Sequence, residues 1–169
     1  MPIAALALDY RDVSGRYTDA PFPQAEAAAI GMLTNLGVVS GNPDGTFTPN
    51  RTLNRAEFLK IALFSTPGLT VPMDHLSSCF PDVGNDAWFT PYICFGKVRG
   101  IVRGYLDGLF RPEREVNYVE AIKILTILYQ YQLVIQAGDP WFGPYVRAAG
   151  ARDVLLPEKI PPAKFLTRG

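Results

Sequence analysis

The glycine-rich stretch Gly100-Ile-Val-Arg-Gly-Tyr-Leu-Asp-Gly-Leu-Phe-Arg-Pro112 has a second version in the same chain, Gly37-Val-Val-Ser-Gly-Asn-Pro-Asp-Gly-Thr-Phe-Thr-Pro49. The two align without a gap, and the match continues through residues 53–61 and 116–124. Self-similarity of this length is the signature of a repeat protein. The repeat therefore defines the organisation of the chain.

A third, partial copy follows. Trp141-Phe-Gly-Pro-Tyr-Val146 matches Trp88-Phe-Thr-Pro-Tyr-Ile93, and Leu166-Thr-Arg168 matches Leu53-Asn-Arg55, but the glycine-rich stretch between them is missing. The third repeat is expected to lack its second helix. The predicted divisions are an N-terminal extension over 1–9, repeats over 10–65, 79–133 and 134–169, and a linker over 66–78.

Each repeat is predicted to begin with a short helix. The three helices are expected over 23–36, 92–99 and 144–152. In the second repeat Thr90 is the predicted N-cap, and the proline that follows it suits the first helical position, where no N–H is needed. Gly100 is the predicted stop, because glycine readily takes the left-handed conformation that ends helices.

The loop after each first helix contains a turn. Asp44-Gly45 and Asp107-Gly108 predict turns in which glycine supplies a positive φ. Gly41 and Gly104, at the start of the same loops, are expected to permit a close backbone approach or an unusual φ.

A second helix follows the loop, and its start is marked by a capping box. Asn54 and Glu57 form the first box, and Asn117 and Glu120 repeat it. Apolar residues at helical spacing follow both boxes, and the later helix is expected to extend to about Gln132. The predicted fold class is all-α, built from helical hairpins that bury their apolar faces against one another.

Composition excludes several functions. The 169 residues are 48% apolar and 19% charged, and 16 basic residues balance 16 acidic ones, so no strongly basic surface for nucleic acid is expected. No apolar run reaches the length of a membrane span. His75 is the only histidine and lies in a turn-rich stretch, so neither a catalytic residue nor a metal site is predicted.

Taken together, the motifs resemble the S-layer homology family. The residues that carry the resemblance are Phe80-Pro-Asp-Val83, Trp88, the stretch 100–112 and Asn54-Arg-Ala-Glu57, and the likeness extends from about Tyr10 to Gly169. It implies three repeats in a pseudo-threefold spindle around a central helical bundle. It also implies a non-catalytic, cofactor-free module on the bacterial surface that binds secondary cell-wall polysaccharide, often pyruvylated, in grooves between repeats.

The chemistry of such a ligand singles out particular residues. Arginine clamps a carboxylate with two hydrogen bonds, and Arg55 sits at a helix N-terminus, where an anion is favoured. If Arg55 clamps the ligand, Arg55→Ala is expected to weaken wall binding with little change in melting temperature. The candidate polysaccharide-binding residues are Arg55, Arg168, Gly41, Asp44, Gly104, Asp107, Trp88 and Trp141.

The chain departs from the family pattern at two arginine positions. Tyr118 stands where the family usually has arginine, and Gly169 follows Arg168 where alanine is usual. Cys79 and Cys94 are not part of the signature. They are predicted to form a disulfide, which fits an oxidising exterior, with two buried thiols as the alternative.

Simpler interpretations stand beside these. Glu57 and Glu120 are helix caps rather than general acids, and the two tryptophans are either core anchors or sugar platforms. Asp44 and Asp107 are turn residues rather than calcium ligands. The alternative for Arg55 is an exposed arginine that pairs across the repeat interface with an aspartate or glutamate and contributes little. The alternative function is an assembly module that contacts neighbouring copies or surface-layer proteins and has lost sugar binding.

Overall fold

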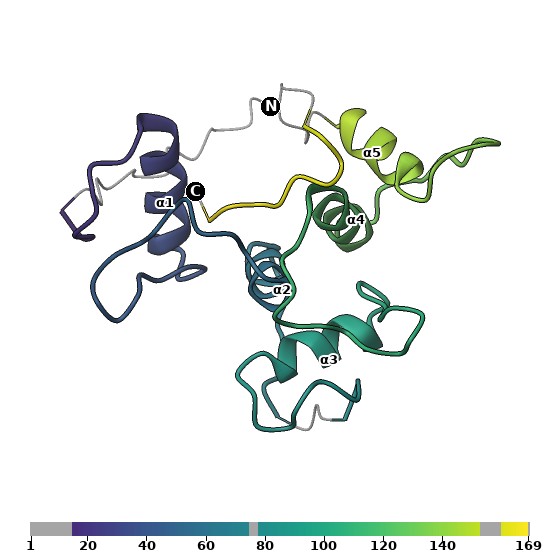
Figure 1. Cartoon of the computed structure of the whole chain (residues 1–169), viewed down its shortest axis with the longest axis horizontal. Coiled ribbons are helices and arrows are strands. Elements are labelled where there is room, and N and C mark those ends of the chain that lie inside the picture. Colours follow the sequence, from purple (N-terminus) through teal and green to yellow (C-terminus); the bar gives the residue numbers. More distant parts are fainter. Residues whose placement is uncertain (1–14, 75–77, 153–159, 169) are drawn as a thin grey trace. The chain divides into compact units, whose positions relative to one another are not determined.

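Helices in the computed structural model follow the proline and glycine signals of the sequence. The structure describes residues 15–74, 78–152 and 160–168, so the extension over 1–9 and His75 lie outside the described residues. Within those ranges the regular structure is helical, with two isolated β-bridges and no strand, which confirms the all-α prediction. The helices (Figure 1) are α1 (Gln24–Asn35), α2 (Arg55–Phe64), α3 (Thr90–Val98), α4 (Tyr118–Leu128) and α5 (Gly143–Gly150).

The chain divides into two compact units. Of the described residues, those from 15 to Arg51 and residues 167 and 168 belong to the first unit, and those between Thr52 and Leu166 belong to the second. Helix α1 belongs to the first unit and the other four helices to the second. The C-terminal residues join the first unit because the backbone N–H of Arg168 donates to the carbonyls of Pro49 and Arg51, each at 3.0 Å.

The core of the first unit is small and aromatic. Tyr17, Ile30 and Phe47 are buried together, with Phe22 packed against them. The Tyr17 hydroxyl lies 2.9 Å from the Thr34 hydroxyl of α1, which fixes the ring against the helix.

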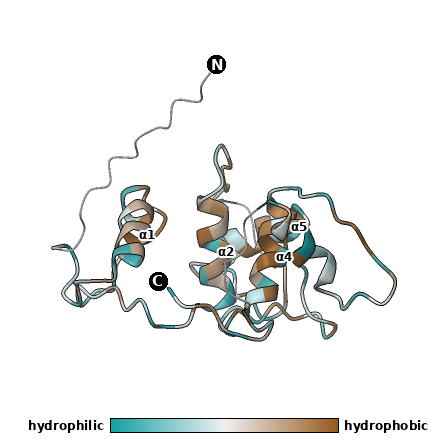
Figure 2. Cartoon of the chain, turned by 90° about the horizontal axis from the view of Figure 1, so that it is seen from above, coloured by the Kyte–Doolittle hydropathy of each residue, from teal (hydrophilic) through white to brown (hydrophobic). Residues whose placement is uncertain are grey.

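In the second unit, α2 packs against α3 and α4, and α4 packs against α5 (Figure 1). Both α2 and α4 show brown, hydrophobic stretches in Figure 2, and both contribute residues to the shared core. Its largest fully buried members are Phe110, Leu59, Leu63, Ile93 and Val116.

A closed ring of backbone hydrogen bonds joins the same position of all three repeats. Leu53 N–H donates to Leu166 at 2.9 Å, Leu166 N–H to Val116 at 3.1 Å, and Val116 N–H to Leu53 at 3.0 Å. Leu53 and Val116 immediately precede the caps of α2 and α4, and Leu166 holds the matching position of the third repeat. The ring fixes where α2 and α4 begin, whereas the pseudo-threefold arrangement of whole repeats stays a prediction.

Capping boxes are present at both second helices. Asn54 accepts from the Glu57 N–H at 2.8 Å, and the Glu57 carboxylate accepts from the Asn54 N–H at 3.1 Å. Asn117 and Glu120 make the same exchange at α4. The boxes account for both glutamates as structural residues.

The disulfide prediction is confirmed. Cys79 and Cys94 are bonded, with their Cα atoms 5.3 Å apart, so the segment before α3 is tied to that helix.

Two predictions about helix ends are wrong. The N-cap of α3 is Phe89, and Thr90 is the first helical residue, buried, with its hydroxyl donating to the Gly84 carbonyl. Helix α4 ends at Leu128 rather than near Gln132. Gln130 takes a left-handed φ of 54°, and the N–H of the next residue returns to the Thr126 carbonyl at 2.9 Å, a C-terminal cap that usually employs glycine.

Candidate functional site

Arg55 lies between two aromatic rings. As the first residue of α2, it follows the Asn54 cap directly, and its guanidinium carbon lies 4.9 Å from the ring centre of Tyr105 and 4.7 Å from that of Phe110. Its Nε donates to the Phe110 carbonyl at 3.1 Å. Only 6% of Arg55 is exposed, so the alternative of an exposed arginine is wrong in its exposure, although Arg55 does pair across the repeats with a glutamate, Glu120.

Glu120, from the cap of α4, is the acidic partner in this cluster. Its Oε1 lies 3.8 Å from Arg55 Nη1 and 2.6 Å from Arg114 Nη1, and it accepts from the Tyr105 hydroxyl at 3.2 Å. Burial lowers the pKa of Arg55, while Tyr105 and Glu120 oppose that shift. Burial likewise raises the pKa of Tyr105, against the effect of Arg55. The cluster therefore holds an arginine in place beside a carboxylate.

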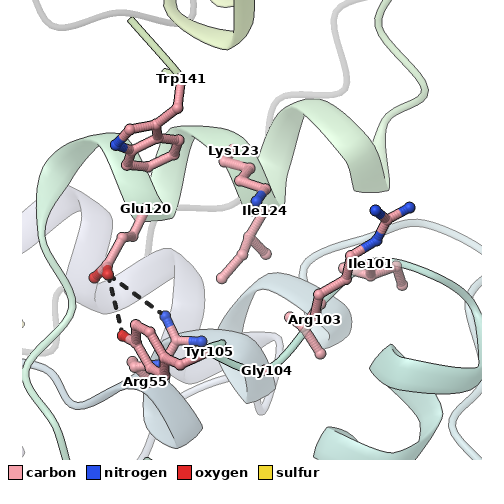
Figure 3. A pocket seen from close by; sticks show the side chains of 10 residues that line it. Arg55, Ile101, Arg103, Gly104, Tyr105, Glu120, Lys123, Ile124 and Trp141 are labelled. Atoms are coloured by element: carbon pink, nitrogen blue, oxygen red, sulfur yellow. Dashed lines mark hydrogen bonds and ion pairs between the residues drawn. The ribbon is translucent and has the colours of Figure 1, made fainter. Parts of the chain in front are cut away.

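Above this cluster opens a cavity of about 210 Å³, which we call the Arg55 pocket (Figure 3). It lies between the loop that follows α3, the side of α4 and Trp141. The lining residues are Arg55, Ile101, Val102, Arg103, Gly104, Tyr105, Glu120, Lys123, Ile124 and Trp141.

The Arg55 pocket is positively charged. Its lining contains three cations, Arg55, Arg103 and Lys123, and one carboxylate, Glu120. Burial lowers the pKa of Lys123, and the nearby Arg103 and Arg55 lower it further. The Lys123 ammonium lies 5.5 Å from the ring centre of Trp141, a distance typical of a cation–π contact. An anionic group with an apolar face suits this surface.

The backbone at the start of α2 is already occupied. The N–H of Arg55 donates to the Arg114 carbonyl at 2.9 Å, and the N–H of Ala56 to Pro112 at 3.1 Å. A third amide, that of Glu57, is bonded to the Asn54 side chain. These three amides are therefore not available to bind an anion, because each of them donates to a protein acceptor.

Gly104 lies in the wall of the Arg55 pocket. A Cβ at this position would come within 2.8 Å of both the Leu109 carbonyl oxygen and the Phe80 ring, so only glycine fits. Asp107 is not part of the lining. It accepts from Leu109 N–H at 3.0 Å and from Arg111 at 2.6 Å, as a turn residue does.

In the first unit, Arg168 repeats the stacking of Arg55. Its guanidinium lies 4.5 Å from the ring centre of Phe47, and its Nη1 donates to Asn42 at 2.9 Å. A Cβ on Gly41 would come within 2.5 Å of the Tyr17 ring. Asp44 accepts from the backbone N–H of Thr46 at 2.9 Å, which closes the turn.

Trp88 and Trp141 are half-exposed, so neither is a fully buried core anchor. Each carries a lysine at its face: Lys60 lies 5.6 Å from the centre of Trp88, as Lys123 does at 5.5 Å from Trp141. Of the two tryptophans, only Trp141 lines the Arg55 pocket.

Tyr118 takes the position of Arg55 at the start of α4, but its surroundings differ. It is buried with Val119, Ile122 and Ala149 in an apolar cluster. This position therefore carries no cation.

Three polar residues of the Arg55 pocket are not predicted from the sequence as binding residues: Arg103, Tyr105 and Lys123. The alignment pairs Lys123 with Lys60, and that repetition was the available signal. Arg103 stands opposite Ser40 in the alignment, so the repeat pattern gives no reason to select it.

Helical hairpins joined by glycine-rich loops, with an arginine of one repeat stacked in the loop of another, define a class of non-catalytic repeat modules. The chain belongs to the S-layer homology domain family, whose model matches residues 16–59 and 80–122. The match falls on the two complete copies of the repeat.

Similar proteins come from bacterial surfaces. The chain is 28% identical over 115 residues to the surface layer protein of Brevibacillus choshinensis and 27% over 168 residues to the surface-layer 125 kDa protein of Lysinibacillus sphaericus. It is 28% identical over 101 residues to the cellulosome-anchoring protein of Acetivibrio thermocellus. These alignments cover 65%, 92% and 59% of the chain, but only 10%, 13% and 22% of the relatives.

The described residues contain neither a candidate membrane span nor a candidate metal site. None of the helices there is both long and apolar enough to cross a membrane. Across residues 15–74, 78–152 and 160–168, no three His, Cys, Asp or Glu side chains gather as metal ligands would.

Proposed function

We propose that the chain is an extracytoplasmic module that anchors a larger protein to the bacterial cell surface by binding a cell-wall polysaccharide. The Arg55 pocket is the proposed binding site, and an acidic substituent of the sugar, such as a pyruvate ketal, is the proposed contact for its cations. No catalytic step is part of the function.

The charge of the pocket is the observation that carries this proposal. Glu120 is already paired, at 2.6 Å, with Arg114, a residue that does not line the pocket. No residue in the described part of the chain forms a salt bridge with Arg103 or Lys123. Two cations therefore face the cavity without an ion pair in the described part of the chain, while Glu120, the lining carboxylate, is paired with Arg55 and Arg114. An anionic ligand would pair with the two cations.

In this proposal Arg55 does not clamp the ligand carboxylate directly. Its guanidinium is stacked against Tyr105 and Phe110, and its Nε is bonded to a carbonyl. It contributes positive charge to the floor of the pocket, while Lys123 and Arg103 make the proposed contacts with the acidic group. Trp141 offers a half-exposed apolar face for a sugar ring.

The relatives support the cellular setting. Two of them are surface-layer proteins and one anchors a cellulosome, and the chain matches only a small part of each. A short module shared by otherwise different surface proteins is what attachment to a common wall polymer requires.

The experiment is co-sedimentation of the 169-residue chain with wall sacculi from the source bacterium, before and after acid removal of the attached polysaccharide. Binding is expected to disappear with the polysaccharide. Lys123→Gln is expected to weaken binding by about tenfold, the effect of losing one charge-assisted hydrogen bond. Because burial already disfavours the Lys123 charge, the variant is expected to fold normally.

Lys164→Gln is the matched control, since it removes the same charge from an exposed position outside the Arg55 pocket. Equal binding to stripped and intact sacculi would contradict the proposed ligand. An unchanged affinity for Lys123→Gln would contradict the proposed pocket.

A further inference from the structure

The connection between α4 and α5 contains an exposed apolar segment, Tyr131-Gln-Leu-Val-Ile-Gln136, which we call the 131–136 segment. In Figure 2 the connection leaves the helices as a loop with a brown, hydrophobic stretch. Val134 and Ile135 are 55% and 79% exposed. An apolar stretch of this kind is uncommon on the surface of a protein that acts alone.

The backbone of the segment is also unpaired. Its ends are fixed, because Tyr131 N–H donates to the Thr126 carbonyl at 2.9 Å and Gln136 N–H to the Asp139 carboxylate at 2.7 Å. Between these ends, the amides of residues 132–135 have no hydrogen-bond partner in the described part of the chain. A row of free amides and carbonyls in a non-helical stretch is a template for strand pairing.

The equivalent connection after α2 shows that exposure is not inherent to this position. There Leu69 and Val71 pack against the core, and Pro67 and Pro72 interrupt any strand. The 131–136 segment has neither proline nor a buried anchor of this kind.

We propose that the 131–136 segment pairs in antiparallel fashion with the same segment of a second copy of this chain. With Leu133 opposite Leu133, Tyr131 of each copy faces Ile135 of the other, so one side of the pair is wholly apolar. Residues 132 and 134 face each other on the second side. The contact is the same for both copies, as twofold symmetry requires.

Charge favours the same partner and the same direction. No residue from 129 to 138 is charged, so two copies approach without repulsion. The Arg152 guanidinium lies 5.2 Å from the ring centre of Tyr131 at one end, and Asp139, which also holds Arg147, lies at the other. Because Arg147 neutralises Asp139, Arg152 is the charge that decides the direction: antiparallel pairing keeps the two Arg152 side chains at opposite ends, whereas parallel pairing would bring them together.

The size of the contact predicts a weak dimer. Two six-residue strands bury less than the roughly 1,200 Å² of a stable interface. The inference does not depend on polysaccharide binding, but copies held on one surface would meet at high effective concentration.

Cysteine cross-linking tests the register. The chain has two cysteines, and both are in the disulfide, so an introduced cysteine is the only free thiol. Opposed residues of an antiparallel pair lie within disulfide range. Leu133→Cys is therefore expected to form a covalent dimer several-fold faster than Ile135→Cys under mild oxidation. Exposure alone predicts the reverse order, since Leu133 is 37% exposed and Ile135 79%.

Sedimentation equilibrium of the unmodified chain provides the second measurement. The average mass is expected to rise above 18.6 kDa with concentration, and Ile135→Lys is expected to abolish the rise. Leu106→Lys, which places the same charge at a fully exposed apolar residue elsewhere, is expected to leave it unchanged. A monomer at all concentrations, faster cross-linking by Ile135→Cys, or association that survives Ile135→Lys would each overturn the proposal. The last outcome would assign association to another surface.

Discussion

Helices α2 and α4 begin with the same cap but with different first side chains. Both follow an asparagine cap with a glutamate at the third helical position. The first amide of α2 donates to Arg114 at 2.9 Å, and that of α4 donates to Lys164 at 2.8 Å. The first side chain is Arg55 in α2 and Tyr118 in α4, and only the former is a cation.

The difference follows from what each position faces. Arg55 meets the glycine-rich loop of the second repeat, which supplies the Tyr105 and Phe110 rings and a carbonyl acceptor. Tyr118 meets the third repeat, which has no such loop, and lies instead in an apolar cluster with Ile160. The start of each helix is thus set by local capping interactions. Whether its first side chain is a cation depends on whether another repeat supplies a loop with aromatic rings against which it can stack.

The largest expected effect comes from removing the cation. Arg55→Leu is expected to destabilise the fold by about 3 kcal/mol, because it breaks a buried cluster and leaves Glu120 with less compensation. This prediction differs from the one made from the sequence, in which an Arg55 that clamps the ligand could be removed with little change in melting temperature. Equilibrium urea unfolding measures the change.

Tyr118→Phe is the control at the matching position. It keeps the buried ring and is expected to change stability by less than about 0.5 kcal/mol. Equal losses in the two variants would show that the two positions are not different in kind.

The caps provide a test of what the two helices share. Asn54→Ala and Asn117→Ala are each expected to cost about 1 kcal/mol, since both remove the acceptor for a glutamate amide. Asn54 also donates to Glu113 at 2.8 Å, so its loss is expected to be slightly the larger. The same urea titrations decide the matter, and a clear loss at only one helix would refute the equivalence of the boxes.

The features that the sequence predicts correctly are local. Repeats, turns and capping boxes depend on residues a few positions apart, and α1 and α3 each end beside a glycine at positive φ. The end of α4 is not predicted, because Gln130 takes the left-handed conformation that glycine usually provides at the end of a helix. The burial of Arg55 and the place of Arg103 in the pocket are also missed, because both depend on which loop lies against which helix.

The smallest effect concerns the pH dependence of the proposed binding, to which both helices contribute a cation. Arg55 of α2 stays protonated at any accessible pH, whereas the pKa of Lys123 of α4 is lowered by burial and then by Arg103 and Arg55. An anionic ligand favours the protonated lysine, so affinity is full below that pKa and falls as the pH rises through it. The loss is at most about tenfold per pH unit, the limit for one proton.

Binding isotherms on intact sacculi between neutral pH and pH 10 measure this loss. It is expected to begin below the ordinary lysine pKa of about 10.4. Lys123→Arg keeps the charge and is expected to flatten the alkaline limb, while Lys164→Arg, at an exposed position, leaves it in place. If the alkaline loss of affinity persists unchanged in Lys123→Arg, the titrating group is not Lys123, and α4 does not contribute the titrating cation to binding.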